Sequence, residues 1–127
     1  MTAMPLLIDT SIWIDHIRAP DGELSAALNS GQVVVHPFVL GEIAVGSIAN
    51  RAEVLSSIDL LPKAIVAEDR EVLEMLDRHR LFGVGIGYID AHLLASTLLT
   101  PDATLWSRDR RLSAAAVLLD IAAYPQS

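Results

Sequence analysis

The sequence contains no cysteine, which excludes disulfide bonds and metal sites built from thiolates. It also lacks an apolar run long enough to cross a membrane, because the stretch at residues 81–99 is broken by Asp90, His92 and three glycines. The first residues carry no basic segment of the kind that opens a signal peptide. We therefore expect no membrane association and a cytoplasmic location, with which the absence of cysteine is compatible.

Basic residues are few: nine Lys and Arg stand against sixteen Asp and Glu, for a net charge of −7. This balance argues against a bulk electrostatic attraction to nucleic acid. However, two divalent cations held by four carboxylates would offset four of these negative charges. Several basic residues are also clustered, at positions 78–80 and 108–111. The charge balance is therefore compatible with a local basic rim beside an acidic pocket.

The chain of 127 residues, 52% hydrophobic, is long enough for one domain with a real core, and we expect residues 1–127 to form a single domain. Alternating apolar runs and helical patterns predict strands and helices in turn. The predicted strands are 5–8, 32–35, 63–67, 104–106 and 118–121. The predicted helices are 11–17, 21–29, 38–49, 51–60, 68–80, 89–99 and 108–116. This alternation predicts an α/β fold with a parallel sheet flanked by helices.

Three carboxylates are isolated in the sequence. Asp9, Glu42 and Asp90 are the only formally charged residues in the stretches 1–14, 24–50 and 81–101 respectively. An ionised carboxylate among apolar neighbours is costly to bury without a partner, and no Lys or Arg is nearby in sequence. If the three segments pack together, shared cations would compensate the carboxylates. The pattern therefore points to a metal site, and from there to phosphate chemistry.

The predicted elements place these acids where ligands bind. In open α/β sheets, ligands lie beyond the carboxyl ends of the strands; Asp9 follows one strand and Asp109 follows another. Glu42 lies on a predicted helix whose same-face neighbours are apolar, and Asp90 opens a helix after a glycine-rich loop. Oxygen ligands without cysteine or paired histidine favour Mg²⁺ or Mn²⁺ over Zn²⁺.

Purely structural interpretations stay open for several of these residues. Asp9 would suit a helix cap, Asp90 would suit a helix N-terminus, and Asp109 could form a surface ion pair with its arginine neighbours. Thr10, Ser11 and Ser107 are either helix caps or supports for the site. His92 lies about 200° around the helix from Asp90, so we expect it to face away from the site. No ligand spacing relates the other histidines, and both tryptophans are expected in the core.

Four motifs occur in one order along the chain: LIDTSIWID at residues 7–15, LGEIAVG at 40–46, GIGYIDAHLLA at 85–95 and LWSRDRRL at 105–112. With these motifs the chain resembles the PIN-domain ribonucleases, and within them the VapC toxins of type II (VapBC) toxin–antitoxin pairs. Each motif alone is weak, but four in order across nearly the whole chain are specific.

The resemblance implies a three-layer α/β/α fold with a central, mainly parallel sheet. It implies Mg²⁺-dependent (or Mn²⁺-dependent) endonucleolytic cleavage of RNA, a homodimer, and neutralisation by a small antitoxin of the VapB type. By position, Asp9, Glu42 and Asp90 match the three acidic metal-site residues, and Asp109 matches a frequent fourth. Thr10 or Ser11 and Ser107 match supporting polar positions. Arg108, Arg110 and Arg111 follow as candidates for RNA contact, because the planar guanidinium binds phosphate oxygens bidentately.

Other functions are weighed against this one. A phosphatase of the haloacid-dehalogenase type would need a second aspartate where Ser11 stands, and a receiver domain would need a late lysine, whereas Lys63 is the only lysine. A solitary PIN nuclease without an antitoxin and a non-catalytic, partner-binding PIN module remain as alternatives.

Overall fold

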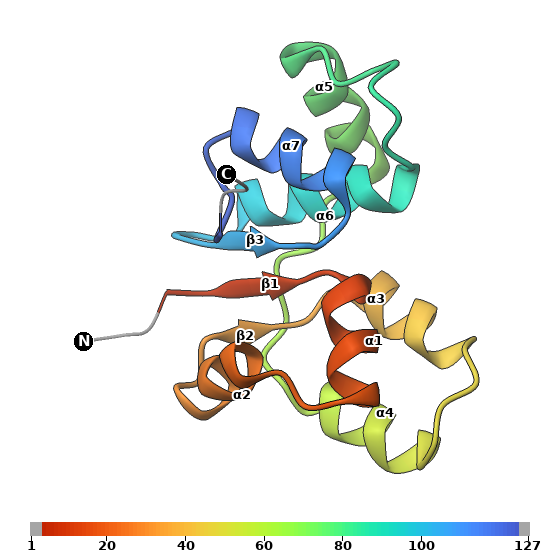
Figure 1. Cartoon of the computed structure of the whole chain (residues 1–127). Helices are drawn as coiled ribbons and strands as arrows, with labels where there is room; N and C mark the ends of the chain where they lie inside the picture. Colours follow the sequence, from red (N-terminus) through yellow and green to blue (C-terminus); the bar gives the residue numbers. More distant parts are fainter. Residues whose placement is uncertain (1–3, 125–127) are drawn as a thin grey trace.

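The computed structural model describes residues 4–124 as a three-stranded sheet with helices on both sides (Figure 1). The strands are β1 (Leu6–Ile8), β2 (Val33–Val34) and β3 (Thr104–Trp106). The helices are α1 (Thr10–Arg18), α2 (Gly22–Asn29), α3 (Pro37–Ala44), α4 (Arg51–Asp59), α5 (Asp69–His79), α6 (Tyr88–Leu99) and α7 (Arg110–Leu118).

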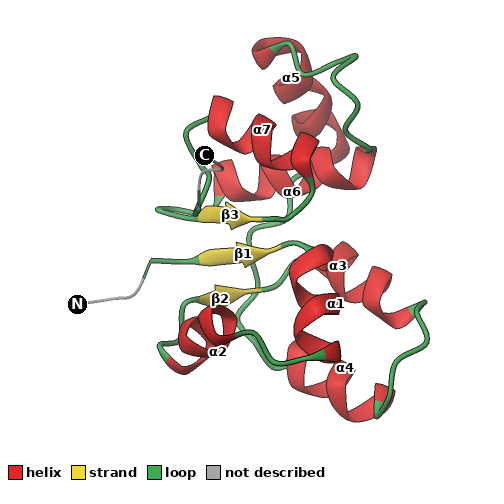
Figure 2. Cartoon of the chain, viewed as in Figure 1, coloured by secondary structure: helices red, strands yellow, loops and turns green. Residues whose placement is uncertain are grey.

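The sheet is parallel, with strand order β2-β1-β3. Leu6 pairs with Val33 on one side and with Thr104 on the other, so β1 is central. The three strand arrows in Figure 2 consequently point the same way. Because parallel strands end at a common edge, the residues that follow β1 and β3 lie close together although about a hundred positions separate them.

Helices pack around this sheet in two groups. α5, α6 and α7 lie on the β3 side of the molecule, and α1 to α4 lie on the side of β1 and β2 (Figures 1 and 2). One core cluster of apolar side chains runs through both groups, and the β1 residues Leu7 and Ile8 are fully buried within it. A parallel strand buried on both faces reads as a continuous apolar run, as β1 does. The predicted three-layer α/β/α fold with a parallel sheet is confirmed.

The strand predicted at 63–67 is wrong apart from one parallel bridge between Val35 and Lys63. The backbone that follows bonds to side chains of α6 instead: the Ile65 N–H donates to the Thr100 hydroxyl at 3.0 Å, and the Ile65 carbonyl accepts from the Ser96 hydroxyl. Half of the Ile65 side chain (48%) remains exposed. The backbone of Ile65 therefore finds its hydrogen-bond partners in hydroxyl side chains and not in a neighbouring strand.

The helix predicted at 38–49 ends at Ala44. The Gly46 N–H tightens the last turn by donating to the Ile43 carbonyl at 3.1 Å. The Arg51 guanidinium donates two hydrogen bonds, of 3.0 and 2.7 Å, to the Ala44 carbonyl. These bonds replace the partner that a continuing helix would have supplied to the carbonyl, which is why the chain can leave the helix there.

The final strand predicted at 118–121 is also wrong. α7 continues to Leu118, and Asp120 adopts a left-handed backbone with φ 59°. Within the described residues, one parallel bridge forms beyond that turn, between Leu105 and Ala122. Among the described residues, no helix has the length and apolar character needed to cross a membrane.

Candidate active site

Asp9 is the buried centre of the candidate site, with 6% of its surface exposed. Its backbone N–H donates to the Trp106 carbonyl at 3.0 Å, which places it between the ends of β1 and β3. Its Oδ2 atom accepts hydrogen bonds from the Ser11 hydroxyl at 2.7 Å and the Ser107 hydroxyl at 2.8 Å. Asp9 occupies the N-cap position of α1, yet its side chain makes no capping hydrogen bond. Capping therefore does not explain this carboxylate.

Glu42 reaches the same region from α3. The Thr10 hydroxyl donates to Glu42 Oε1 at 3.1 Å, so the residue after Asp9 holds the second carboxylate. The expectation of an apolar, buried surrounding for Glu42 is wrong, because Glu42 itself is exposed and Val45, which lies beyond the helix, is 89% exposed. Glu42 is therefore a solvent-facing group with freedom to move its outer atoms.

Asp90 lies half-buried in the first turn of α6 and accepts a hydrogen bond from the Gly87 N–H at 3.2 Å. Burial raises the pKa of the Asp90 carboxyl above its ordinary value of 3.8, against the opposing effect of the Gly87 hydrogen bond. The negative charges of Asp9, Asp109 and Glu42 raise this pKa further. The fold therefore brings the four candidate carboxylates within electrostatic reach of one another.

Asp109 is the exposed fourth carboxylate and the N-cap of α7. Its Oδ1 atom accepts from the Leu112 N–H at 2.9 Å, and its backbone N–H donates to the Ser107 hydroxyl at 2.9 Å. Within residues 4–124 it forms no ion pair with the neighbouring arginines. Ser107 therefore ties the backbone of Asp109 to the side chain of Asp9.

The four carboxylates share a pattern of contacts. Each accepts hydrogen bonds on one oxygen, while in the described part of the chain the second oxygen accepts none. In residues 4–124 no Lys, Arg or His forms a salt bridge with any of them. No three His, Asp or Glu side chains of that region already converge closely enough to hold an ion. Coordination of a shared cation would therefore need the outer oxygens to turn inward.

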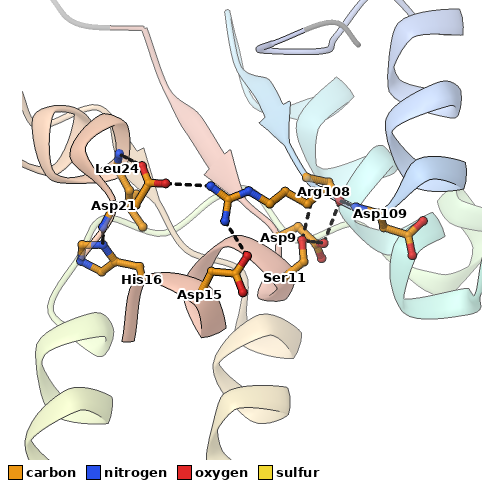
Figure 3. A network of polar contacts seen from close by, with 9 residues as sticks. Asp9, Ser11, Asp15, His16, Asp21, Leu24, Arg108 and Asp109 are labelled. Atoms are coloured by element: carbon orange, nitrogen blue, oxygen red, sulfur yellow. Dashed lines mark hydrogen bonds and ion pairs between the residues drawn. The ribbon is translucent and has the colours of Figure 1, made fainter. Parts of the chain in front are cut away.

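Arg108 is committed to neighbours within the protein. Its guanidinium forms ion pairs with Asp15 and with Asp21, the latter at 2.7 Å, and Figure 3 shows it between these two carboxylates. Its backbone N–H donates to the Ser11 hydroxyl at 3.1 Å. Arg108 precedes α7, whereas Arg110 and Arg111 begin that helix. The helix predicted at 108–116 therefore begins two residues later, and Arg108 lies outside it.

Arg111 lies across the glycine loop before α6. Gly85 has φ +86°, and a Cβ atom built there would come within 2.8 Å of the Arg111 side chain. Gly85 therefore permits both the turn and the close approach of the arginine. Arg110 and Arg111 are exposed, and neither is in an ion pair within the described residues. Their guanidinium groups are available to an anionic ligand on the α7 side of the site.

The histidines contribute more than the sequence indicated. His92 is buried, and its Nε2 atom lies 3.0 Å from Oδ1 of Asp69. His36 is fully buried and caps α3, with Nδ1 accepting from the Phe38 N–H at 3.0 Å. The two rings are 6.2 Å apart between centroids. No motif spacing marked this pair, because 56 positions separate residues that only the fold brings together.

The sequence was compared with known proteins. The family model of the PIN domain matches residues 6–118. The chain is 44% identical over 110 residues to the protein named Ribonuclease VapC32 in two strains of Mycobacterium tuberculosis, CDC 1551 / Oshkosh and H37Rv, covering 87% of this chain and 89% of each relative. The chain belongs to the PIN-domain family. Within it, this identity places the chain with the VapC proteins. All four candidate carboxylates lie inside the matched PIN region.

Proposed function

We propose that this protein is an endoribonuclease that depends on a divalent metal, hydrolyses phosphodiester bonds of RNA and acts as the toxin of a toxin–antitoxin pair. One observation carries the proposal: in a chain 44% identical to a VapC ribonuclease, four carboxylates lie within electrostatic reach of one another. Asp9 and Asp109 follow β1 and β3, Glu42 lies in the second half of α3, and Asp90 lies in the first turn of α6. Within the described residues these carboxylates have no basic partner.

Asp9, Glu42, Asp90 and Asp109 are the proposed ligands, and Mg²⁺ or Mn²⁺ the proposed cofactor. The donor set fits such an ion because it consists of carboxylate oxygens, which hard divalent cations prefer. The raised pKa of Asp90 also fits: burial raises it most, the other carboxylates add to the rise, and a bound cation would relieve the repulsion among them. When bound, such an ion lowers the pKa of water and stabilises charge on a phosphate.

The surrounding residues would orient this set. Ser11 and Ser107 fix Asp9 by bonding to the same oxygen, and Thr10 restrains Glu42. Asp109 lies next to Ser107, so its position is coupled to that of Asp9. The carboxylates would also accept the proton of the attacking water, and no side chain is required as a covalent nucleophile.

Arg110 and Arg111 are proposed to contact the RNA backbone. Both are exposed at the start of α7, directly after Asp109. Arg108 was also predicted to contact RNA from sequence, but its guanidinium is held by Asp15 and Asp21. For Arg108 to bind RNA, a phosphate group would first have to displace those two carboxylates from its guanidinium. The stronger proposal therefore rests on the other two arginines.

The partners are proposed from family membership and from the exposed apolar surface. A small VapB-like antitoxin is proposed from membership of the VapC group, and an open groove of about 590 Å³ between α1 and α4 offers an apolar surface to a protein segment. A homodimer is proposed because large apolar side chains such as Leu73, Phe82 and Leu118 are 55–70% exposed. The proposed setting is the cytoplasm, with residues 1–127 acting as one domain.

The test of the nuclease is RNA cleavage by purified protein in EDTA, then in added Mg²⁺ or Mn²⁺. We expect no cleavage in EDTA, full recovery with metal, and none at any metal concentration for Asp9→Asn. The asparagine keeps an oxygen for the two serine hydroxyls, so it removes charge and little else. Cleavage that persists in excess EDTA would refute the metal-dependent mechanism.

The alternatives give different results in the same preparation. A non-catalytic partner-binding module would show no metal-dependent turnover of RNA. A solitary nuclease would cleave RNA but fail to co-purify with the product of a short neighbouring reading frame. Light scattering that shows only monomers at working concentration would remove the homodimer without affecting the other proposals.

A further inference from the structure

His36 and His92 form a buried pair that the proposed chemistry does not use. Their exposed fractions are 0% and 2%, and each has one ring nitrogen without a hydrogen-bond partner within residues 4–124: Nε2 of His36 and Nδ1 of His92. Unpaired polar atoms in a core are costly, so two neighbouring ones call for an explanation. The rings lie edge to face with centroids 6.2 Å apart.

The hydrogen bond at the start of α3 fixes which nitrogen of His36 carries the proton. Nδ1 accepts from the Phe38 N–H, so its lone pair is in use and the neutral ring must carry its proton on Nε2. Burial lowers the pKa of His36 to about 4, with a smaller contribution from His92, so the ring is neutral near pH 7. His36 therefore presents an unpaired donor.

The partner of His92 likewise fixes which nitrogen of its ring carries the proton. Nε2 lies 3.0 Å from Oδ1 of Asp69, a carboxylate oxygen that also accepts from the Tyr88 hydroxyl at 2.6 Å. A carboxylate only accepts, so Nε2 of His92 donates, and Nδ1 of the neutral ring is left as an acceptor. A buried ring with an unpaired donor thus packs beside a buried ring with an unpaired acceptor.

The separation of the rings decides how the two can be joined. Each ring nitrogen lies about 1.1 Å from its ring centre, so the two nitrogens are at least about 4 Å apart, which exceeds a direct hydrogen bond. Polar groups at such a separation are commonly joined by one water molecule, and a buried water needs at least two polar partners. We propose that one buried water bridges His36 Nε2–H to His92 Nδ1 and that this bridge sets the position of α3 relative to α6.

The bridge joins the starts of three helices. His36 caps α3, which carries Glu42; His92 lies on α6, two residues after Asp90; and Asp69 is the first residue of α5. A restraint between α3 and α6 fixes how far Glu42 can stand from Asp90. The inference, which rests on the proposed metal site, makes His36 and His92 positioning residues for that site. Neither is a ligand or a catalytic residue.

Conservative substitutions separate the two nitrogens of each ring. His36→Asn keeps a good capping oxygen for the Phe38 N–H and removes the Nε2 donor. His92→Gln keeps a donor toward Asp69 and removes the Nδ1 acceptor, whereas His92→Asn keeps an acceptor near Nδ1 and loses the bond to Asp69. Val72→Ala, in the core on α5, is the control for general destabilisation, since it opens a cavity without removing a hydrogen-bonding group.

Two readouts test the inference on purified protein without RNA: Mn²⁺ affinity by calorimetry and stability by urea unfolding. We expect His36→Asn and His92→Gln each to weaken Mn²⁺ binding by about three- to tenfold, less than loss of a group that bonds directly to a ligand. The double variant, His36→Asn with His92→Gln, should bind Mn²⁺ no more weakly than the weaker-binding single variant, because either change removes the same bridge. Its loss of stability should likewise be smaller than the sum of the two single losses. His92→Asn should bind Mn²⁺ more tightly than His92→Gln, and Val72→Ala should bind like the wild type.

The remaining results would overturn the inference at identifiable points. Additive losses of stability in the double variant would show that no bridge joins the rings. Coupled stability with unchanged Mn²⁺ affinity would leave a structural bridge and refute the positioning role. A wild-type protein that binds no Mn²⁺ would refute the proposed metal site and with it the positioning role, while the unfolding cycle would still decide whether the bridge exists.

Discussion

Ser107 donates a 2.8 Å hydrogen bond to the buried carboxylate of Asp9, joining the ends of β3 and β1 across 98 positions of sequence. The same hydroxyl accepts from the Asp109 N–H. One serine therefore connects the most buried carboxylate of the site to the backbone of the most peripheral one. This connection makes Ser107 a test of whether the acids act as one set.

Ser107→Ala should lower both stability and turnover. We expect a loss of about 1–2 kcal/mol of unfolding free energy, because a buried hydrogen bond is removed and the Asp109 N–H loses its acceptor. Turnover should fall by about tenfold, since groups that orient a ligand typically have effects of this size. Thr97→Val removes another buried hydroxyl, which bonds to the Leu93 carbonyl, and should lower stability alone. Equal turnover losses in both variants would assign the effect to stability.

Asp90→Asn should abolish cleavage and yet stabilise the metal-free protein. The pKa of Asp90 is raised by burial and by neighbouring negative charge, so its ionised form destabilises the folded state above that pKa. Asparagine removes this penalty and retains an oxygen for the Gly87 N–H. In EDTA at pH 7, thermal melting should move upward by a few degrees. The gain should shrink as the pH is lowered toward 4, and a lower melting temperature at pH 7 would instead indicate a structural function for Asp90.

Asp109→Asn should reduce turnover by less than Asp9→Asn, because Asp109 is exposed and Asp9 is buried at the centre. Asparagine preserves the cap of α7, so the melting temperature should stay near that of the wild type. Asp109→Ala should reduce turnover similarly and also cost about 1 kcal/mol of stability through loss of the cap. Wild-type turnover in Asp109→Asn would remove this residue from the metal site.

Arg110→Ala and Arg111→Ala should each weaken RNA binding and flatten its salt dependence. A lost phosphate contact lowers the slope of log affinity against log salt by about one. Binding is best measured by fluorescence anisotropy in an Asp9→Asn background, where RNA stays uncleaved. Arg78→Ala, at the far end of α5, is the matched charge control. Salt slopes that do not change in either α7 variant would remove the basic rim from the proposal.

The lowered pKa of buried His36 predicts that the protein loses stability on mild acidification. Its pKa falls from 6.5 to about 4 on burial, so between these values the unfolded chain binds a proton that the folded protein does not. Stability from this residue is therefore full above pH 6.5 and declines as the pH falls toward 4. Urea unfolding at pH 7 and pH 5 should show a larger decline for the wild type than for His36→Asn. Equal declines would place the titration elsewhere.

The sequence by itself determined the strand–helix alternation and the positions of the three main strands, because a buried parallel strand needs an unbroken apolar run and such runs are visible in one dimension. It also singled out Asp9, Glu42 and Asp90, since an isolated charge in an apolar stretch is visible without a structure. The same reasoning failed at 63–67, where the Ile65 backbone bonds to the hydroxyls of Ser96 and Thr100, and at 118–121, where α7 continues to Leu118. Composition does not distinguish these outcomes, because apolar residues also occur at exposed positions: Ile65 is 48% and Leu118 is 70% exposed.

Only the tertiary structure decided what surrounds each charge. Asp9 is buried while Glu42 is exposed, although both looked alike in sequence. Arg108 forms ion pairs with Asp15 and Asp21, which lie about ninety positions earlier in the sequence. The residues next to Arg108 in the sequence therefore do not indicate these partners. The His36–His92 contact was missed for the same reason. The physical cause is common to all of these: burial, ion pairing and hydrogen bonding depend on distance in space, and a residue's sequence neighbours report only its own strand or helix.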